Sequence, residues 1–293
     1  MPKTYLQSLQ LAKNLFKKNK ISSPEVNAEL LLSHVVKKPR LELYLNANKV
    51  LTKNQEQRYN QLVQERIKRK PLQYILGETG FYGLKLKVDK SVLIPRPETE
   101  ILVESVINFF KDRESKLQII DWGTGSGNIA IALAKNLNCL VYALDISKSA
   151  LKVAKKNARL NKVSYKIKFL PSNSFEKINR RLENKIDAIV SNPPYVKKSD
   201  FQKLPKEIKK FEPKIALLSP QNGLFYLQKI IKEAKHLLKP SGIIVLEVAL
   251  GQAKKVVKLL EKEENFENIQ VKKDLTGIDR VVLAQKLIKE EIL

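Results

Sequence analysis

The 293-residue sequence is poor in the residues that build covalent and metal-based sites. It has one cysteine, Cys139, and two histidines, His34 and His236. A single cysteine excludes a disulfide framework, and so few histidines and cysteines argue against a catalytic metal site. Both histidines stand in apolar helical patterns, where a structural role is expected. We therefore expect no metal and a reducing, cytoplasmic environment.

Long hydrophobic runs and negative charge are also scarce. No apolar stretch approaches the roughly 20 residues that span a bilayer, and the first residues lack the features of a secretory signal, so no membrane association is expected. The chain has 55 Lys and Arg against 30 Asp and Glu, a formal net charge of +25. Because the lysines are scattered along the whole chain, this charge favours solvated faces with weak, nonspecific nucleic-acid contact over a dedicated polyanion partner.

The chain divides into three regions by its patterns. Residues 1–70 show apolar residues at helical spacing and two candidate capping boxes, beginning at Ser22 and at Thr52. Residues 71–95 contain three glycines and the alternating stretch LKLKV, which is typical of a β-hairpin linker. Residues 96–293 form the third region, which alternates strand and helix patterns from residue 117 onward.

This alternation predicts the fold. The expected strands are LQIIDWG, CLVYALD, YKIKFL, IDAIVSN, GIIVLEVA and two more within IQVKKDLTGIDRVVLAQK, the last of them antiparallel at the edge. Helical patterns separate most of the first five strands, as in βαβ units with a parallel sheet. We predict an α/β fold, a doubly wound Rossmann-like domain with a small all-helical N-terminal domain.

A glycine-rich loop, DWGTGSGN at 121–128, joins the first strand of this sheet to its helix. Glycines allow a tight turn and the close approach of a ligand, and phosphate, dinucleotide and adenosyl-methionine sites all use such loops. Asp145 closes the second strand, twenty residues after Gly125, where a carboxylate can accept the ribose hydroxyls of an adenosine. The spacing favours a nucleoside without separating NAD from S-adenosylmethionine. The alternatives are a plain glycine turn and an N-cap aspartate.

The stretch IVSNPPYV at 189–196 discriminates between these ligands. It ends a later strand, so it belongs at the carboxyl edge of the sheet, beside the glycine loop. The oxygen of Asn192 and the carbonyl of Pro193 can each accept one N–H of a planar NH₂ group, which positions a weak nucleophile and stabilises its growing positive charge. Tyr195 offers a ring to a flat substrate. The motif therefore indicates methyl transfer to a planar nitrogen; a proline-stiffened turn is the alternative.

Together these motifs resemble the HemK/PrmC family of release-factor glutamine methyltransferases over nearly the whole chain. The resemblance lies in AELLLSHV, RLELYL, RKPLQYILGETGFYGLKLKV, DWGTGSGNIAIALA, ALDIS, IVSNPPYV, FEP, LEVALGQ and DLTGIDRVV. NPPY alone is shared with adenine-N6 methyltransferases of nucleic acids. LIPRPETE at 93–100, together with the helical region, is more specific and argues against the sister family that methylates a ribosomal protein.

The resemblance implies a class I methyltransferase that uses S-adenosylmethionine and no metal. Its expected substrate is the glutamine side-chain amide in the Gly-Gly-Gln loop of class I peptide chain release factors, and its expected role is to tune translation termination. It further implies that residues 1–70 dock the release factor, that 71–95 are a linker, and that 96–293 form the methyltransferase domain. A monomer is expected.

The resemblance also implies site residues. Catalysis would fall to Asn192, Pro193 and Tyr195, which with Pro194 would hold the glutamine. The donor would be held by Gly123, Thr124, Gly125, Ser126, Gly127, Asp145, Asn173, Ser174 and Asn192.

The sequence departs from the family pattern at three points. Asn173 and Ser174 stand where an aspartate followed by an aromatic residue is common, so Asn173 can still bond an adenine, whereas stacking at Ser174 is lost. Trp122 replaces a commoner aliphatic residue, and the stretch around Glu247 differs slightly. The stretch IPRPETE either shapes the cavity or simply begins a helix.

Two other functions fit part of the sequence. An adenine-N6 nucleic-acid methyltransferase would use the same NPPY chemistry and would suit the basic charge, but no base-reading module is recognisable. A basic RNA-binding scaffold with a decayed site would have lost at least one of the glycine loop, Asp145 and NPPY, and all three are intact.

Overall fold

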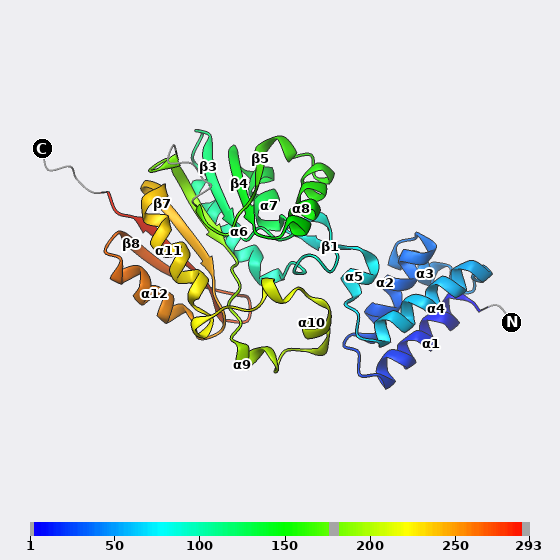
Figure 1. The fold of residues 1–293 in the computed structure, drawn as a ribbon. Helices are drawn as coiled ribbons and strands as arrows, with labels where there is room; N and C mark the ends of the chain where they lie inside the picture. The colour runs from blue at the N-terminus through cyan, green and yellow to red at the C-terminus, as the bar shows by residue number, and fades with distance from the viewer. Residues whose placement is uncertain (1–2, 176–181, 289–293) are drawn as a thin grey trace, which may run out of the picture. The chain divides into compact units, whose positions relative to one another are not determined.

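The computed structural model describes residues 3–175 and 182–288. It divides into two compact units (Figure 1). The helical unit comprises Met1–Gly77 together with Pro205–Phe211, and the sheet unit comprises Glu78–Leu204 and Glu212–Leu293. The chain therefore leaves the helical unit after Gly77 and returns to it once, for seven residues, in the middle of the sheet unit.

The helical unit contains only helices as regular elements among its described residues. They are α1 (Tyr5–Lys18), α2 (Pro24–Val36), α3 (Arg40–Leu45), α4 (Lys53–Ile67), α5 (Leu72–Leu76) and α10 (Lys206–Phe211). Phe16, Leu31 and Leu32 are fully buried at the centre of its core. On α10, Glu207 lies 3.3 Å from Nη1 of Arg69 and 3.5 Å from Nη1 of Arg66. Ion pairs therefore hold the segment Pro205–Phe211 against α4 and the residues that follow α4.

Of the two expected capping boxes, one is confirmed and one is wrong. Thr52 caps α4 reciprocally with Gln55. At α2 the N-cap is Ser23, in a left-handed conformation and without a side-chain cap bond, so Ser22 does not cap this helix. The side-chain Nδ2 of Asn27 donates to the carbonyls of Ser22 and Ser23. These bonds fix the turn before α2, but they satisfy carbonyl oxygens and not the free N–H groups that a cap accepts from.

The sheet unit begins with the predicted hairpin, β1 (Glu78–Phe81) and β2 (Leu84–Lys87), which pair antiparallel. Its main sheet has the strands β3 (Leu117–Trp122), β4 (Cys139–Asp145), β5 (Ile167–Pro171), β6 (Ile186–Ser191), β7 (Leu238–Glu247), β8 (Phe266–Lys273) and β9 (Asp279–Lys286). Their order is β5-β4-β3-β6-β7-β9-β8, parallel from β5 to β7 and antiparallel from there to the β8 edge. The predicted doubly wound α/β fold is confirmed. The prediction that the last strand lies at the edge is wrong, because β9 lies between β7 and β8 and the edge strand is β8.

The helices of this unit occur between the strands as the sequence pattern predicts. The α-helices are α6 (Glu100–Phe110), α7 (Asn128–Asn136), α8 (Lys148–Leu160), α9 (Lys198–Phe201), α11 (Phe225–Leu237) and α12 (Ala253–Lys262). Short 3₁₀ turns cover Pro97–Thr99, Ser164–Lys166, Lys214–Ala216 and Gln221–Gly223.

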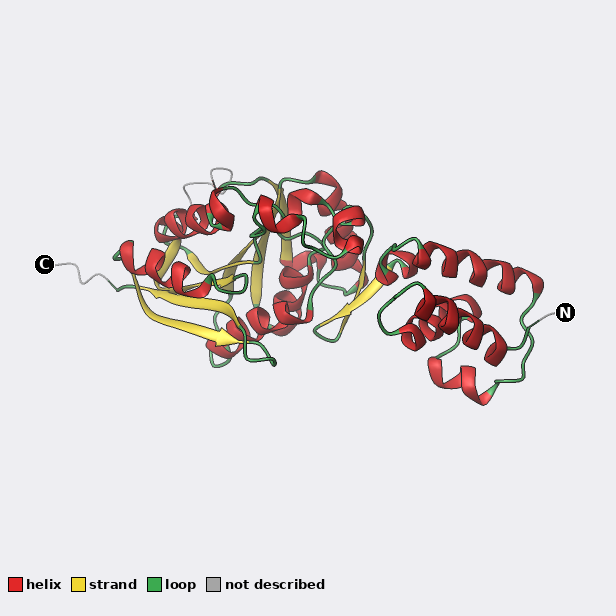
Figure 2. Cartoon of the chain, turned by 90° about the horizontal axis from the view of Figure 1, so that it is seen from below, coloured by secondary structure: helices red, strands yellow, loops and turns green. Residues whose placement is uncertain are grey.

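The central strands are apolar on both faces because helices cover both. On β3, Ile119 packs into the core beneath α6, α7 and α8, while Ile120 packs into the core beneath α11 and α12. Ala188 and Ile189 on β6 divide in the same way. Successive strand residues point to opposite faces, so a continuous apolar run is what a doubly covered strand requires. Figure 2 shows the resulting helix–sheet–helix layers.

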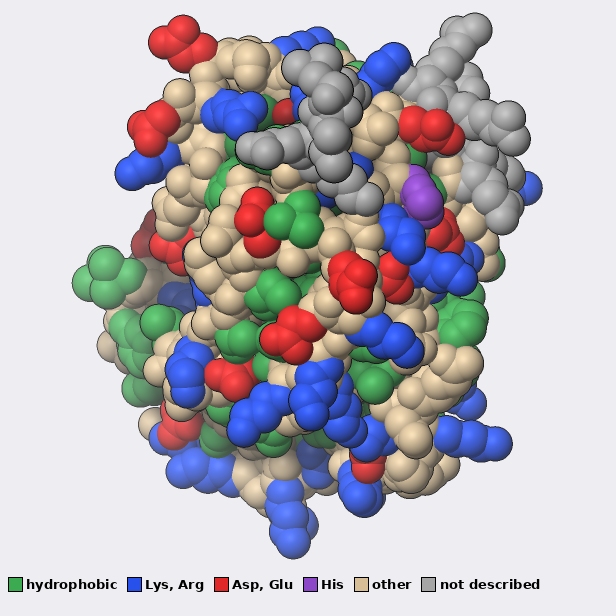
Figure 3. Space-filling view, turned by 90° about the vertical axis from the view of Figure 1, so that its left-hand side faces the viewer, with side chains coloured by type: hydrophobic (Ala, Val, Ile, Leu, Met, Phe, Trp, Pro, Cys, Tyr) green, Lys and Arg blue, Asp and Glu red, His purple; other side chains and the backbone are tan. Residues whose placement is uncertain are grey.

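Positive and negative side chains are mixed on the face of the molecule that Figure 3 shows. Figure 3 shows the face of the molecule at which α11, α12 and β8 lie, and Lys and Arg side chains are interspersed there with Asp and Glu. Lys235 and Glu263 form an ion pair of 2.7 Å on this part of the sheet unit. Within residues 3–175 and 182–288, no helix has the length and apolar character needed to cross a membrane.

Candidate active site

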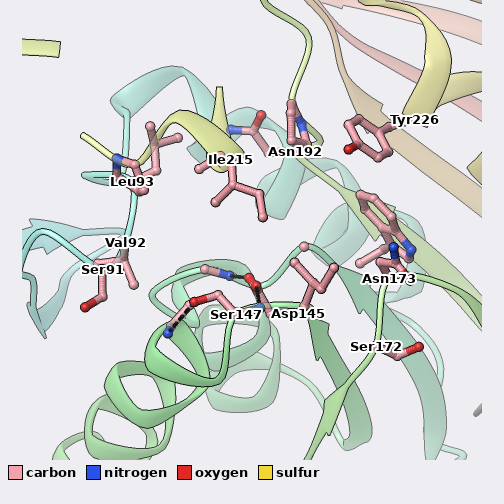
Figure 4. Close-up of a pocket in the computed structure, with 18 residues that line it drawn as sticks. Ser91, Val92, Leu93, Asp145, Ser147, Ser172, Asn173, Asn192, Ile215 and Tyr226 are labelled. Atoms are coloured by element: carbon pink, nitrogen blue, oxygen red, sulfur yellow. Dashed lines mark hydrogen bonds between the residues drawn. The ribbon is translucent and has the colours of Figure 1, made fainter. Parts of the chain in front are cut away.

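A pocket opens at the carboxyl edge of the main sheet, at the ends of four neighbouring strands. Gly123 and Gly125 follow β3, Asp145 ends β4, Asn173 follows β5 and Asn192 follows β6, and all five line the pocket. The chain runs outward from β3 in both directions, to β4 on one side and β6 on the other, which makes this edge a topological switch point. In Figure 4, Asp145 and Asn192 lie on opposite walls of the pocket.

The glycine loop uses its three glycines in two different ways. Gly123 and Gly125 have positive φ angles of 74° and 55°, and a Cβ added to either would meet no atom closer than 3.9 Å. At Gly127, in contrast, a Cβ would lie 3.0 Å from Cδ1 of Ile131 and 3.1 Å from Cβ of Ala154. The first two glycines therefore leave open space in the pocket for a ligand, and Gly127 allows α7 to pack closely on α8.

Asp145 is held rigidly at the floor of the pocket. Its Oδ2 accepts the N–H of Gly125 at 2.9 Å, and its Oδ1 accepts the N–H of Ser147 at 2.8 Å. Burial raises the pKa of this carboxyl, and the two N–H groups oppose the shift. Each oxygen has a further lone pair, so the carboxylate is fixed in place yet can accept two hydroxyl groups of a ligand. That capacity fits the ribose of a nucleoside.

A second carboxyl, that of Asp121, supports the glycine loop from beneath. It is fully buried, and its Oδ2 accepts the hydroxyl of Thr124 at 2.6 Å and the N–H of Ala130 at 3.2 Å. Burial raises the pKa of Asp121 to about 7. Thr124 is thereby occupied in holding the loop, and its side chain is buried rather than directed into the pocket.

The loop Asn192–Tyr195, called the acceptor loop below, is held in place by contacts between its backbone and neighbouring segments. The N–H of Val196 donates to the carbonyl of Leu217 at 2.8 Å, immediately after the loop. A Cβ at Gly223 would lie only 2.4 Å from the carbonyl oxygen of Tyr195, so the chain passes there at a distance only glycine permits. Nε2 of Gln252 donates to the same Tyr195 oxygen at 3.4 Å.

Side chains from distant segments also hold the acceptor loop. Nδ2 of Asn192 donates to Oγ1 of Thr99 at 3.1 Å, and the hydroxyl of Tyr195 donates to Oε1 of Glu247 at 3.4 Å. Burial raises the pKa of Glu247 to about 7, and hydrogen bonds from Thr99 and Tyr195 lower it. Burial likewise raises the pKa of the Tyr195 hydroxyl. Sequence analysis missed Thr99 as a site residue because a threonine in a helix-starting turn carries no signal of its own.

Two aromatic rings line one end of the pocket. The rings of Trp122 and Tyr226 lie 5.5 Å apart, and both residues line the pocket with Asn173. Nε1 of Trp122 is buried and has no hydrogen-bond partner among the described residues. Ser174 is buried, and its backbone is bonded to Oγ of Ser172 instead of facing the pocket. A flat heterocycle with a hydrogen-bond acceptor would fit this end.

Two further segments form the side of the pocket. Residues 91–93 and residues 213–216 both contribute lining side chains, among them Val92 and Ile215 (Figure 4). An ion pair joins the segments, since Nη2 of Arg96 donates to Oε1 of the buried Glu212 at 2.6 Å. Two interpretations of IPRPETE were open. The helix start is confirmed by the 3₁₀ turn Pro97–Thr99 and α6. Arg96 also stabilises this wall of the pocket through its ion pair with Glu212.

Six of the residues named from the sequence line the pocket and six do not. Those that line it are Gly123, Gly125, Asp145, Asn173, Asn192 and Pro194. The others, Thr124, Ser126, Gly127, Ser174, Pro193 and Tyr195, are not among the lining residues. In the part of the chain that the structure describes, no group of three or more His, Cys, Asp or Glu could hold a metal ion.

Comparison with known proteins supports this assignment. A model described as the PrmC N-terminal domain matches residues 7–77, and one described as a methyltransferase domain matches residues 113–289. The release factor glutamine methyltransferase of Fusobacterium nucleatum is 40% identical over 94% of this chain and 77% of that protein. The one from Thermodesulfovibrio yellowstonii is 41% identical over 92% of this chain and 95% of that protein. The chain belongs to the release factor glutamine methyltransferase family.

Membership of this family accounts for both units of the chain, because each has its own match. It also makes the chain an enzyme with a methyltransferase domain, as the glycine loop and the acceptor loop predict. Among solved structures, the catalytic domain of hMettl16 in complex with the MAT2A 3'UTR hairpin 6 has a TM-score of 0.56 and 16% identity over 84% of this chain and 87% of that one. This likeness extends to the fold alone.

Proposed function

We propose that this protein transfers a methyl group from S-adenosylmethionine to the side-chain amide nitrogen of the glutamine in the Gly-Gly-Gln loop of class I release factors. The observation that carries the proposal is the pocket itself, which Asp145 and Asn192 line from opposite walls. One wall suits a nucleoside, and the other suits a planar amide. The relatives that cover both units carry the same activity in their names.

The donor side of the pocket, lined by Gly123, Gly125 and Asp145, suits S-adenosylmethionine in its hydrogen-bonding groups. Asp145 would accept the ribose hydroxyls, the open space at Gly123 and Gly125 would take the part of the donor that approaches the backbone, and the Trp122–Tyr226 end would take the adenine. When bound, the donor supplies an electrophilic methyl group on a sulfonium. No residue of the chain needs to act as a strong base.

The acceptor loop would prepare the nucleophile. An amide nitrogen is weakly nucleophilic because its lone pair is delocalised, so it must be held still and its growing charge stabilised. We assign Oδ1 of Asn192 and the carbonyl oxygen of Pro193 to the two N–H groups of the glutamine. Pro193 and Pro194 restrict the backbone, which lowers the entropic cost of presenting that carbonyl. The methylated amide then loses its extra proton to water.

The helical unit would recognise the protein substrate. Residues 7–77 carry the match to the PrmC N-terminal domain, which is separate from the methyltransferase match. We propose that it docks the release factor, so that binding energy from the docked surface helps to place the glutamine loop. We also propose that the protein acts as a monomer in the cytoplasm, without a metal and without a nucleic-acid requirement.

The test is to incubate the purified protein with a class I release factor and isotopically labelled S-adenosylmethionine, and to map the label by tandem mass spectrometry. We expect one methyl group on the glutamine of the Gly-Gly-Gln loop. Adenine-containing RNA and DNA in parallel reactions test the nucleic-acid alternative, and they should stay unlabelled. Label on nucleic acid and none on the release factor would overturn the proposal.

A further inference from the structure

Two segments that are distant in the sequence, residues 91–96 and residues 212–216, meet at one side of the pocket and supply it with apolar side chains. Those that line the pocket from these segments are Val92, Leu93, Pro213, Ile215 and Ala216. In Figure 4 the Ile215 side chain points into the pocket, toward Asp145. A ligand that fills the pocket would remove these side chains from water, so both segments would contact it.

The segment 91–96 is anchored in the sheet unit. Val92 and Ile94 are buried. The N–H of Ser91 donates to Oδ1 of Asp89 at 2.8 Å, and the N–H of Val92 donates to the carbonyl of Asp89 at 3.1 Å. Buried side chains and a closed turn hold this segment in one position, so it forms a fixed side of the pocket.

The segment 212–216 is anchored less firmly. Ile215 is 54% exposed, and none of the residues in its 3₁₀ turn is buried. At the end next to the acceptor loop, the carbonyl of Leu217 accepts the N–H of Val196 at 2.8 Å. This end of the segment is therefore attached to the sheet unit by its backbone, and the position of the rest depends on what holds Glu212.

An ion pair holds Glu212 and joins the two segments. Nη2 of Arg96 donates to Oε1 of Glu212 at 2.6 Å. The Glu212 side chain is 2% exposed, and its Oε2 has no hydrogen-bond partner among the described residues. A buried carboxylate that loses its cation is strongly unfavourable. Without Arg96, the segment would therefore move until Glu212 reached water.

We propose that Arg96 and Glu212 are positioning residues for the methyl donor. Their ion pair holds residues 91–96 and 212–216, called the donor clasp below, closed against the bound donor. When the pair breaks, the segment 212–216 moves away about its attachment at Leu217, and the donor can leave. The inference rests on the proposed function, in which this pocket holds S-adenosylmethionine. Neither Arg96 nor Glu212 lines the pocket, so both act through the segments that they join.

The donor clasp should determine how fast the donor leaves. Loss of the ion pair opens the clasp more often, which raises the dissociation rate of the donor. The groups that meet the donor at the glycine loop and at Asp145 stay in place, so the donor is still recognised. Changes in affinity among variants of one binding site lie mostly in the dissociation rate, and the clasp should follow this rule.

The experiment measures donor binding by stopped-flow fluorescence on the full-length protein. Trp122 is the single tryptophan of the chain and lines the pocket, so its emission reports whether the pocket is occupied. The protein is mixed with increasing concentrations of S-adenosylmethionine, and the relaxation rate is recorded. The slope of this rate against concentration gives the association rate constant, and the intercept gives the dissociation rate constant.

The variants are Arg96→Met, Glu212→Gln, the combination of both, and Arg96→Lys. Arg96→Met and Glu212→Gln each remove the ion pair, and each should raise the dissociation rate by about tenfold, the size of a hydrogen bond to a charged group. The association rate should change by less than about twofold. The double variant should be no faster than the faster single one, because both changes break the same pair. Arg96→Lys keeps the positive charge and should retain most of the slow dissociation.

An ion pair outside the pocket gives the matched control. Nζ of Lys239 lies 2.9 Å from Oδ1 of Asp187, whose side chain is 5% exposed, and neither residue lines the pocket. Lys239→Met also leaves a buried carboxylate without its cation, so it should lower the melting temperature, as Arg96→Met does. Its donor dissociation rate should nevertheless equal that of the wild type.

The outcomes separate this inference from the function on which it rests. Equal dissociation rates in the wild type, Arg96→Met and Glu212→Gln would overturn the donor clasp and leave the proposed function standing. Equally fast dissociation in Lys239→Met and Arg96→Met would also overturn the clasp, since a general loss of stability would then explain the effect. If Arg96→Met fails to fold, Glu212→Gln, which leaves no buried charge, decides alone. Wild-type protein that binds no S-adenosylmethionine would overturn the proposed function, and the clasp with it.

Discussion

The two walls of the pocket are built by different means. The donor side is held by main-chain groups: Asp145 accepts N–H groups from Gly125, twenty residues before it, and from Ser147, two residues after it. The acceptor loop is held by groups remote in sequence, with Thr99 before it and Glu247 and Gln252 well after it. A wall held by main-chain N–H groups suits binding, whereas a wall supported by several buried side chains can hold one atom in a set direction. The two should therefore fail differently when altered.

The largest effect is expected on the acceptor loop. Asn192→Ala removes the oxygen proposed to accept a substrate N–H, and we expect turnover on a release factor to fall by about 10²–10³, as when one preorganised hydrogen-bonding group is deleted. Donor affinity measured by calorimetry should change little. Circular dichroism verifies the fold. Near-wild-type turnover in a folded variant would remove Asn192 from the proposed chemistry.

A substitution on the donor side of the pocket should instead lower the affinity for S-adenosylmethionine. Asp145→Ala deletes a fixed carboxylate, and S-adenosylmethionine binding should weaken by about 1.5–3 kcal/mol, the size of hydrogen bonds to a charged group. At saturating donor, much of the turnover should return, which distinguishes this wall from the acceptor loop. Asp112→Ala, on an exposed residue after α6, is the matched control. Equal donor affinity in the two variants would contradict the comparison.

Substitutions in the glycine loop distinguish an effect on donor binding from an effect on stability. Gly127→Ala places a Cβ about as close to Ile131 and Ala154 as the packing allows, at a φ of 83°, and should lower the free energy of unfolding by about 1–3 kcal/mol. Gly123→Ala meets no neighbour and should cost only about 1 kcal/mol of left-handed strain. Its main effect should be on donor affinity. Denaturant unfolding and calorimetry on both variants measure this; a reversed order of the two stabilities would be evidence against these roles.

The smallest effect is expected at Tyr195. Tyr195→Phe keeps the ring and removes a long hydrogen bond of 3.4 Å to Glu247, so kcat should fall by only about two- to fivefold. Tyr195→Ala also removes the ring and should be much slower. If the two variants were equally slow, the hydroxyl rather than the ring would be the important part of this residue.

The sequence was informative wherever a short stretch determines its own structure. Continuous apolar runs predicted the strands, and the position of Asn192 directly after β6 followed from the strand order. Thr99 and Glu247 could not be recognised in this way. Their importance comes from a contact with residues 93 positions later and 52 positions earlier, respectively. Ser22 shows the same limit at α2, because Asn27 satisfies the carbonyls there.

The return of Pro205–Phe211 to the helical unit has a practical consequence for proteolysis. A single cut between Gly77 and Glu78 would divide the polypeptide, but α10, with Glu207 near Arg66 and Arg69, would then belong to the larger fragment while packing in the helical unit. The two fragments would be expected to copurify under native conditions and to separate in denaturant. The division after Gly77 thus separates two compact units without being a place where one piece can be removed.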